Sequence, residues 1–166
     1  LAALAISASY AEGLASGSAL KVDLGTVVST GVVLPVDGIT SAGQPDEAAL
    51  KVFAEQGYTT VIDLRTEGED RGIDEAKVVE ELGMEYLTLP IGRESISFES
   101  ARVLDQLIES ADGPVLIHCA SANRVGALLA LRKSLSGADD VTALEYGREG
   151  GMTSLESSVQ EVLSAD

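Results

Sequence analysis

The only histidine and the only cysteine of the chain are neighbours, at His118 and Cys119, and four residues separate this cysteine from Arg124. An apolar run over 114–117 precedes the pair, and a second apolar run over 125–135 follows the arginine. This pattern predicts a strand, a tight loop and a helix. A thiolate and a guanidinium at the two ends of such a loop would provide a nucleophile and an oxyanion ligand.

The start of the predicted helix strengthens this interpretation. The first N–H groups of a helix have no intrahelical partner, and the helix dipole places partial positive charge there. A loop that curls over this end adds further N–H groups and forms a cradle for an anion. We expect the cradle to stabilise Cys119 as a thiolate and Arg124 to bind oxygens in a bidentate manner. The small residues of the loop allow close approach, so the expected anion-binding residues are Ala120, Ser121, Ala122, Asn123 and Arg124.

A simpler interpretation exists for both residues of the pair. A lone cysteine is often a small buried apolar residue. The arginine and the strand-loop-helix context favour a nucleophilic role for Cys119 instead. For His118 we expect a supporting role rather than a catalytic one.

Strands and helices alternate along the rest of the chain. Apolar spacing and capping residues predict helices over 46–56, 74–82, 97–109, 139–147 and 153–163, and strands over 59–64 and 84–89. Short strands at 27–28 and 32–34 would form an edge hairpin. The alternation predicts an α/β fold with a mainly parallel sheet flanked by helices. Ligands bind such sheets at the carboxyl ends of the strands, which is where the Cys119 loop would lie.

The loop and several upstream segments resemble the cysteine-dependent protein tyrosine phosphatases, in particular their dual-specificity-like bacterial branch. The segment 41–45 is similar to the family's approach to its first helix, 60–65 to its strand with a polar turn, and 86–91 to the strand that enters the general-acid loop. The resemblance covers about 38–135. It implies a phosphatase-like fold, hydrolysis of a phosphate monoester through a phosphocysteine intermediate, and no cofactor.

Two features depart from this family. Its loop usually has five residues between cysteine and arginine, and a Ser or Thr usually follows the arginine, whereas this chain has four residues and Val125. Four residues are the spacing of rhodanese-type sulfurtransferases, which carry a persulfide on the cysteine. A sulfurtransferase with a persulfide on Cys119 and a non-catalytic anion-binding module therefore remain as alternatives.

The position of the general acid is also unusual. The family takes an Asp from the loop after the strand that corresponds to 84–89, but residues 90–95 contain no Asp. Glu94 is the nearest candidate, and a solvated surface carboxylate is an equally good interpretation of it. Five charged residues follow another strand end and could line the same cleft: Asp63, Arg65, Glu67, Glu69 and Asp70. Arg65 is either a second anion contact or, as we expect, an ion-pair partner for one of these carboxylates. We expect no metal, because this acidic cluster includes no histidine in the sequence and no ligand spacing stands out.

The composition restricts the partners. The chain of 166 residues has 11 basic and 27 acidic residues and a net charge of −16. Such acidity argues against binding to nucleic acid or to an anionic membrane. We expect the partner to be a phosphorylated or sulfur-bearing small molecule or protein. One cysteine excludes an intramolecular disulfide, and the sequence does not indicate an oligomeric state.

The first residues bear on location. Residues 1–11 are apolar and uncharged, and they resemble the end of a secretory signal peptide with a small-x-small cleavage pattern. The expected organisation is a signal-peptide remnant over 1–11 and a single phosphatase-like domain over 12–166. We expect export to the periplasm, with a cytoplasmic location as the alternative.

Overall fold

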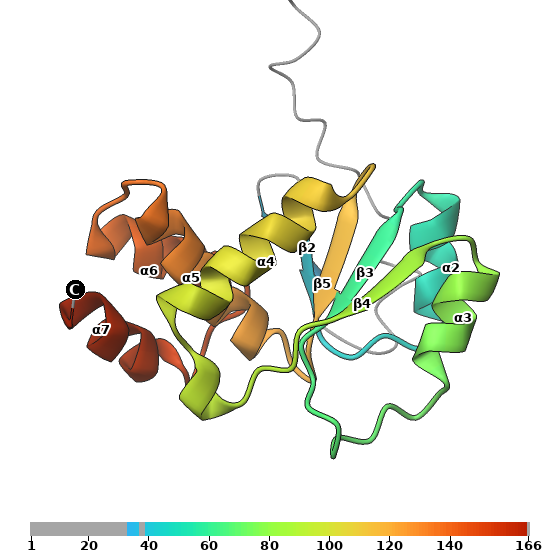
Figure 1. The fold of residues 1–166 in the computed structure, drawn as a ribbon, viewed down its shortest axis with the longest axis horizontal. Coiled ribbons are helices and arrows are strands. Elements are labelled where there is room, and N and C mark those ends of the chain that lie inside the picture. The colour runs from blue at the N-terminus through green and yellow to red at the C-terminus, as the bar shows by residue number, and fades with distance from the viewer. Residues whose placement is uncertain (1–32, 37–38, 166) are drawn as a thin grey trace, which may run out of the picture.

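The computed structural model describes residues 33–36 and 39–165, and these residues form one sheet with helices on both of its faces (Figure 1). The strand order is β1-β2-β5-β3-β4. Neighbours among β2, β5, β3 and β4 pair in parallel, while β1 pairs with β2 in the antiparallel sense. The predicted mainly parallel sheet is therefore confirmed. The strands are β1 (Val33–Val36), β2 (Ile39–Ala42), β3 (Thr60–Asp63), β4 (Glu85–Thr88) and β5 (Val115–His118).

The helices lie where the apolar spacing predicts them. Asp46, Asp74, Ser97 and Asp139 each precede a helix and accept a hydrogen bond from a backbone N–H three residues later, which satisfies one open donor of the first turn. The helices are α2 (Glu47–Glu55), α3 (Glu75–Glu81), α4 (Phe98–Ser110), α5 (Asn123–Leu135), α6 (Asp140–Glu149) and α7 (Glu156–Ser164), with a short 3-10 helix η1 (Arg93–Ser95).

Each face of the sheet packs on its own group of helices. Helices α2 and α3 lie on one side, and α4, α5, α6 and α7 lie on the other (Figure 1). Alternate residues of a strand point to opposite faces. Val61 and Leu116 accordingly belong to the core with α2 and α3, whereas Ile62 and Ile117 belong to the core with α4 and α5. Because both faces are covered, the central strands are apolar throughout most of their length.

Close contact between α5 and α6 fixes the helix that begins at the candidate site. Gly126 lies on α5, and a side chain there would collide with the backbone of Gly147 and Met152. Only glycine allows this approach of the two helices. The position of α5, and hence of its N-terminal end, is set by this packing.

Strand β2 is an element that the sequence analysis did not predict. Two polar residues, Thr40 and Ser41, interrupt its apolar pattern, yet both are buried. The hydroxyl of Thr40 hydrogen-bonds the hydroxyl of Tyr58, and the Ser41 hydroxyl donates to the Gly150 carbonyl at 2.6 Å. These partners make the burial of polar residues acceptable.

Some expectations fall outside the described part of the chain. The predicted signal-peptide remnant over 1–11 and the short strand at 27–28 are among the residues that the structure does not describe. Among the described residues, every helix is too short or too polar to cross a lipid bilayer.

Candidate active site

The loops that follow β3, β4 and β5 meet at one edge of the sheet, at the carboxyl ends of these parallel strands (Figure 1). The loop that contains Cys119 connects β5 to α5, as predicted. It enters the helix through Ala122, whose φ of 66° is left-handed. Such a conformation is uncommon for a residue other than glycine, and it turns the chain sharply into α5.

The segment after β2 holds the Cys119 loop from one side. The backbone N–H of Cys119 donates to the Ala42 carbonyl at 3.3 Å, and the N–H of Gln44 donates to the Ala120 carbonyl at 3.2 Å. Gly43 and Ser121 form an isolated antiparallel bridge between these two bonds. The segment 41–45 therefore lies directly against the loop.

Strand alternation separates the histidine from the cysteine. His118 ends β5 on the side of α2 and α3, while Cys119 packs into the core formed with α4 and α5. Cys119 is only 1% exposed, whereas the next two residues, Ala120 and Ser121, are exposed. The thiol therefore lies beneath its loop in this structure.

Arg124 is held by three hydrogen bonds at the far end of its guanidinium group. Its Nη1 donates to Glu69 Oε1 at 2.6 Å and to the Ile91 carbonyl at 3.2 Å, and its Nη2 donates to Glu69 Oε2 at 2.6 Å. The Glu69 bonds are the main cause that raises the pKa of Arg124; burial opposes it, and an interaction with Cys119 adds to it. Glu69 and the Ile91 carbonyl thus occupy the far end of the guanidinium.

A pocket of about 320 Å³ opens over Arg124. It is formed by the ends of the three loops and by the turn before α7, and Cys119 is not among its lining residues. Those residues are Thr66, Glu69, Ile91, Gly92, Arg93, Asn123, Arg124 and Leu155.

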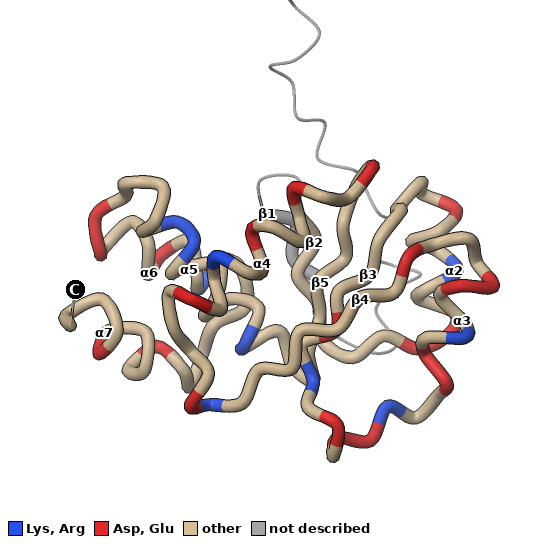
Figure 2. Tube along the Cα trace, in the orientation of Figure 1, with Lys and Arg blue, Asp and Glu red and all other residues tan. Residues whose placement is uncertain are grey.

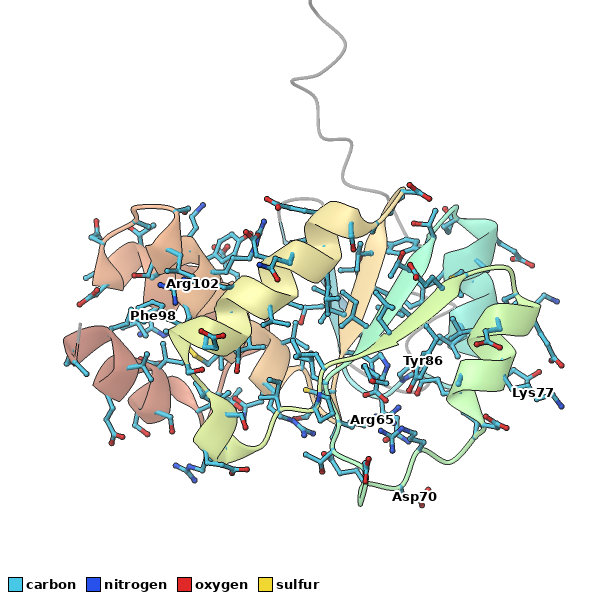
Figure 3. The ribbon with its side chains drawn as sticks, viewed as in Figure 1. Arg65, Asp70, Lys77, Tyr86, Phe98 and Arg102 are labelled. Atoms are coloured by element: carbon cyan, nitrogen blue, oxygen red, sulfur yellow. The ribbon has the colours of Figure 1, made fainter. Side chains whose placement is uncertain are left out.

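A buried ionic cluster lies on the other face of the sheet, behind the loop. Arg65 contacts Asp63 through Nε at 2.9 Å, and its Nη2 donates to Glu75. The Nε2 of His118 lies 2.6 Å from Glu75 Oε1, and all four side chains are inaccessible to solvent. Figure 3 shows Arg65 and Tyr86 beside the ends of β3 and β4. We name this group, Asp63, Arg65, Glu75 and His118, the buried cluster.

The buried cluster keeps the Asp63 carboxylate ionised. Burial alone would raise the pKa of Asp63, but hydrogen bonds from Arg65 and the electrostatic interaction with His118 outweigh it and lower the pKa to about 2. The Tyr86 hydroxyl donates to the same carboxylate at 2.8 Å. Burial and this negative neighbour raise the pKa of Tyr86 to about 12.

The structure corrects the expectation that no histidine accompanies the acidic residues. One ligand atom from each of Asp63, Glu75 and His118 lies within 4.8 Å of the others. The guanidinium of Arg65 contacts both carboxylates, so this arginine is the cation of the cluster, as its expected ion-pair role requires. Glu75 is a member of the cluster that was not predicted from the sequence, although its spacing of four from the buried Val79 places the two residues on one helix face.

Glu94 lies at the edge of the site rather than over the cysteine. It is exposed on η1 and lines a second pocket, of about 580 Å³, together with residues of α7. Its carboxylate covers Gly92, which lines the pocket over Arg124. Glu94 is thus near the Arg124 pocket but does not line it.

The side chain of Asn123 has a structural partner. Its Oδ1 accepts hydrogen bonds from the backbone N–H groups of Thr153 at 2.8 Å and Leu155 at 3.3 Å, and its Nδ2 donates to Ser154 Oγ at 2.8 Å. It therefore attaches the turn before α7 to the start of α5. The backbone of Asn123 is the part that an anion could contact.

Comparison with known families places this fold and loop in a defined class. Residues 34–136 match the phosphatase-like domain of beta-lactamase hydrolase-like proteins, and the chain belongs to this family. The beta-lactamase hydrolase-like protein of Agrobacterium fabrum is 30% identical over 118 residues, which are 68% of this chain and 27% of that protein. The protein of the same name from Xylella fastidiosa is 33% identical over 112 residues, 63% of this chain and 26% of that protein. The chain therefore spans about a quarter of the length of these relatives.

Solved structures with the same fold are phosphatases or candidate phosphatases by description. A candidate phosphatase from Neisseria meningitidis superposes with a TM-score of 0.66 and 22% identity, over 77% of this chain and 93% of that one. TpbA of P. aeruginosa gives a TM-score of 0.61 and 18% identity, over 77% and 80% of the two chains. A TpbA variant in complex with phosphotyrosine gives 0.59 and 19%, over 76% and 84%. At these identities the similarity establishes the fold.

Proposed function

We propose that this domain is a cysteine-dependent phosphatase that hydrolyses a phosphate monoester. The observation that carries the proposal is the placement of Cys119 and Arg124 at the two ends of one loop, between the carboxyl end of β5 and the first turn of α5. Membership of a phosphatase-like family supports the same activity. The substrate would be a small phosphorylated molecule or a phosphoprotein, and the TpbA complex makes phosphotyrosine a suitable first compound to test.

The proposed reaction has two steps. The Cys119 thiolate attacks phosphorus and forms an S–P bond, the P–O ester bond breaks, and the departing oxygen takes up a proton. Water then attacks phosphorus and gives a proton to the carboxylate that donated one in the first step, the S–P bond breaks, and inorganic phosphate leaves with the thiolate regenerated. Arg124 and the loop N–H groups would hold the oxygens of the transferring group, where negative charge accumulates in the transition state.

The proposed reaction also needs a residue that donates the proton to the departing oxygen. Glu94 is our candidate donor, and it is exposed on η1 beside the Arg124 pocket. A distant acid would assist poor leaving groups most and good leaving groups little. We therefore expect a steep dependence of the rate on the pKa of the leaving alcohol.

Hydrolysis of p-nitrophenyl phosphate tests the proposal. We expect turnover by the natural protein and none by Cys119→Ser, which keeps the shape of the side chain but lacks the thiolate. Arg124→Lys keeps the charge but loses the planar fork, so its kcat/KM should fall by about a hundredfold. Turnover that persists in Cys119→Ser, or its absence in the natural protein, would refute the proposal.

A second function is favoured by one observation, the four-residue spacing between Cys119 and Arg124. A rhodanese-type sulfurtransferase would transfer a sulfur atom from thiosulfate to the thiolate, form a persulfide on Cys119 and release sulfite. No general acid is needed for that step. Because the chain has one cysteine, the mass of the intact protein after thiosulfate treatment decides the question: a gain of one sulfur atom supports this function.

A further inference from the structure

We propose that Glu69 is a positioning residue that fixes the orientation of Arg124 for oxyanion binding. This inference rests on the proposed oxyanion site but not on the reaction performed there. The carboxylate of Glu69 binds both terminal nitrogens of Arg124 at 2.6 Å, across 55 positions of sequence. The Arg124 side chain is 17% exposed and that of Glu69 is 29% exposed, so water screens the pair only in part.

The donors that Glu69 uses are not the donors that an anion on the thiol side would use. An arginine has five N–H groups, and the bonds to Glu69 and Ile91 account for both on Nη1 and one on Nη2. The remaining pair, on Nε and Nη2, forms the side-on fork that binds two oxygens of a tetrahedral anion. Since Cys119 directly precedes the loop that leads to Arg124 in the first turn of α5, we place the bound anion between this fork and the thiol.

Glu69 is itself held in place, which a positioning role requires. Its Oε1 accepts hydrogen bonds from the backbone N–H of Thr66 at 2.8 Å and from the Thr66 hydroxyl at 3.1 Å. Arg71 in turn donates to the backbone carbonyls of Arg65, Thr66 and Glu69 and to the Asp63 carboxylate. The backbone of the loop between β3 and α3 is therefore held by hydrogen bonds within the loop, independently of the contact between Glu69 and Arg124.

The electrostatic state of Glu69 agrees with this role. The hydrogen bonds from Arg124 are the main cause that lowers the pKa of Glu69 to about 2, against a smaller opposing effect of burial. Glu69 is thus an ionised hydrogen-bond acceptor at neutral pH. An inhibitory role would require it to block the anion, but its carboxylate occupies the terminal nitrogens and not the side-on fork.

Tungstate binding and phosphatase kinetics of Glu69→Gln test the inference. The amide keeps the size of the side chain but cannot accept on both of its terminal atoms, so Arg124 should lose its fixed orientation. We expect the Kd of tungstate, measured by calorimetry, to rise about tenfold, and kcat on p-nitrophenyl phosphate to fall by tenfold or more. Glu69→Asp should recover part of both values, because a carboxylate is restored.

Glu67→Gln is the matched control, since it removes the same charge from an exposed position of the same loop. It should change neither value. Unchanged tungstate affinity and kcat in Glu69→Gln, or tighter tungstate binding, would overturn the inference, the latter by indicating that Glu69 competes with the anion. If the natural protein shows no turnover but binds tungstate, and Glu69→Gln weakens that binding, the proposed function fails while the positioning role stands.

Discussion

Two glutamates of one chain segment contact the two ends of the candidate catalytic loop, in opposite environments. Glu75 contacts His118 inside the protein, where neither side chain is accessible to solvent. Glu69 contacts Arg124 at the surface of the Arg124 pocket, with 29% of its side chain exposed. In the loop between β3 and α3, three acidic residues, Glu67, Glu69 and Asp70, lie between two arginines, and Figure 2 shows this loop with red segments between blue ones. The comparison leads us to expect different effects from the two contacts: the buried one should matter most for stability, and the half-buried one for the orientation of Arg124.

Removing the cation of the buried cluster should have the largest effect. Arg65→Met leaves the carboxylates of Asp63 and Glu75 buried without their main partner. We expect the free energy of unfolding to fall by about 3–5 kcal/mol, measured by urea denaturation. Lys77→Met is the control, because its ion pair with Glu81 is exposed and should contribute less than about 0.5 kcal/mol. Equal effects of the two substitutions would contradict the distinction between buried and exposed pairs.

The second largest effect should come from acid, which removes the contribution of Asp63 to the free energy of unfolding. The folded-state pKa of Asp63 is about 2, below its usual value of 3.8. The contribution of this group to stability is therefore complete above about pH 4 and is lost as the pH falls toward 2, and its size is about 2 kcal/mol. Urea denaturation of the natural protein and of Asp63→Asn, at several pH values, isolates this term. Parallel pH dependence of the two proteins between pH 4 and pH 2 would speak against it.

A smaller effect is expected where the support of Glu69 is weakened but not removed. Thr66→Val deletes the hydroxyl that donates to Glu69 at 3.1 Å and keeps the backbone bond at 2.8 Å. The tungstate Kd should rise about two- to threefold, because Thr66 acts on the anion only through Glu69 and Arg124 and the backbone bond to Glu69 remains. The urea midpoint should stay within error. A loss of stability without a change of affinity would assign Thr66 to folding instead.

The smallest effect is expected at Glu94. Its substitution by Gln should change kcat on p-nitrophenyl phosphate by less than about twofold, because p-nitrophenolate departs without protonation. The same substitution should slow the hydrolysis of phenyl phosphate more, since phenolate is a poorer leaving group. If Glu94→Gln hydrolyses each of the two substrates at the same rate as the natural protein does, Glu94 is not the proton donor.

The strand-loop-helix around Cys119 could be predicted because its signals are local. The apolar run before His118, the small loop residues and the apolar helix after Arg124 lie within a short stretch of sequence, and capping residues mark most of the other helices. Strand β2 was not predictable in this way, because Thr40 and Ser41 are polar and only their tertiary partners explain their burial.

The ion pairs of the site could not be predicted from local pattern either. Glu69 and Arg124 are 55 positions apart, and nothing in the composition of the β3–α3 loop distinguishes Glu69 from its exposed neighbours Glu67 and Asp70. Glu75 carries a weak signal, its helical spacing from Val79, but acidic residues in the first turn of a helix are normally solvated. The assignment of a role to each carboxylate therefore required the fold.

The hydrogen bonds of Arg71 determine which positions of the loop between β3 and α3 tolerate substitution. Because this one side chain ties together the backbone of the loop between β3 and α3, the shape of the loop depends little on the residues at its tip. Asp70 lies at that outer tip in Figure 3, and Glu67 and Gly68 are exposed as well. Asp70 accepts a hydrogen bond from the Gly72 N–H at 2.8 Å, so we expect the charge and size of Glu67 and Gly68, rather than of Asp70, to change without moving Glu69. Substitutions at the exposed positions of the loop can thus change the surface next to the Arg124 pocket while the contact between Glu69 and Arg124 is kept.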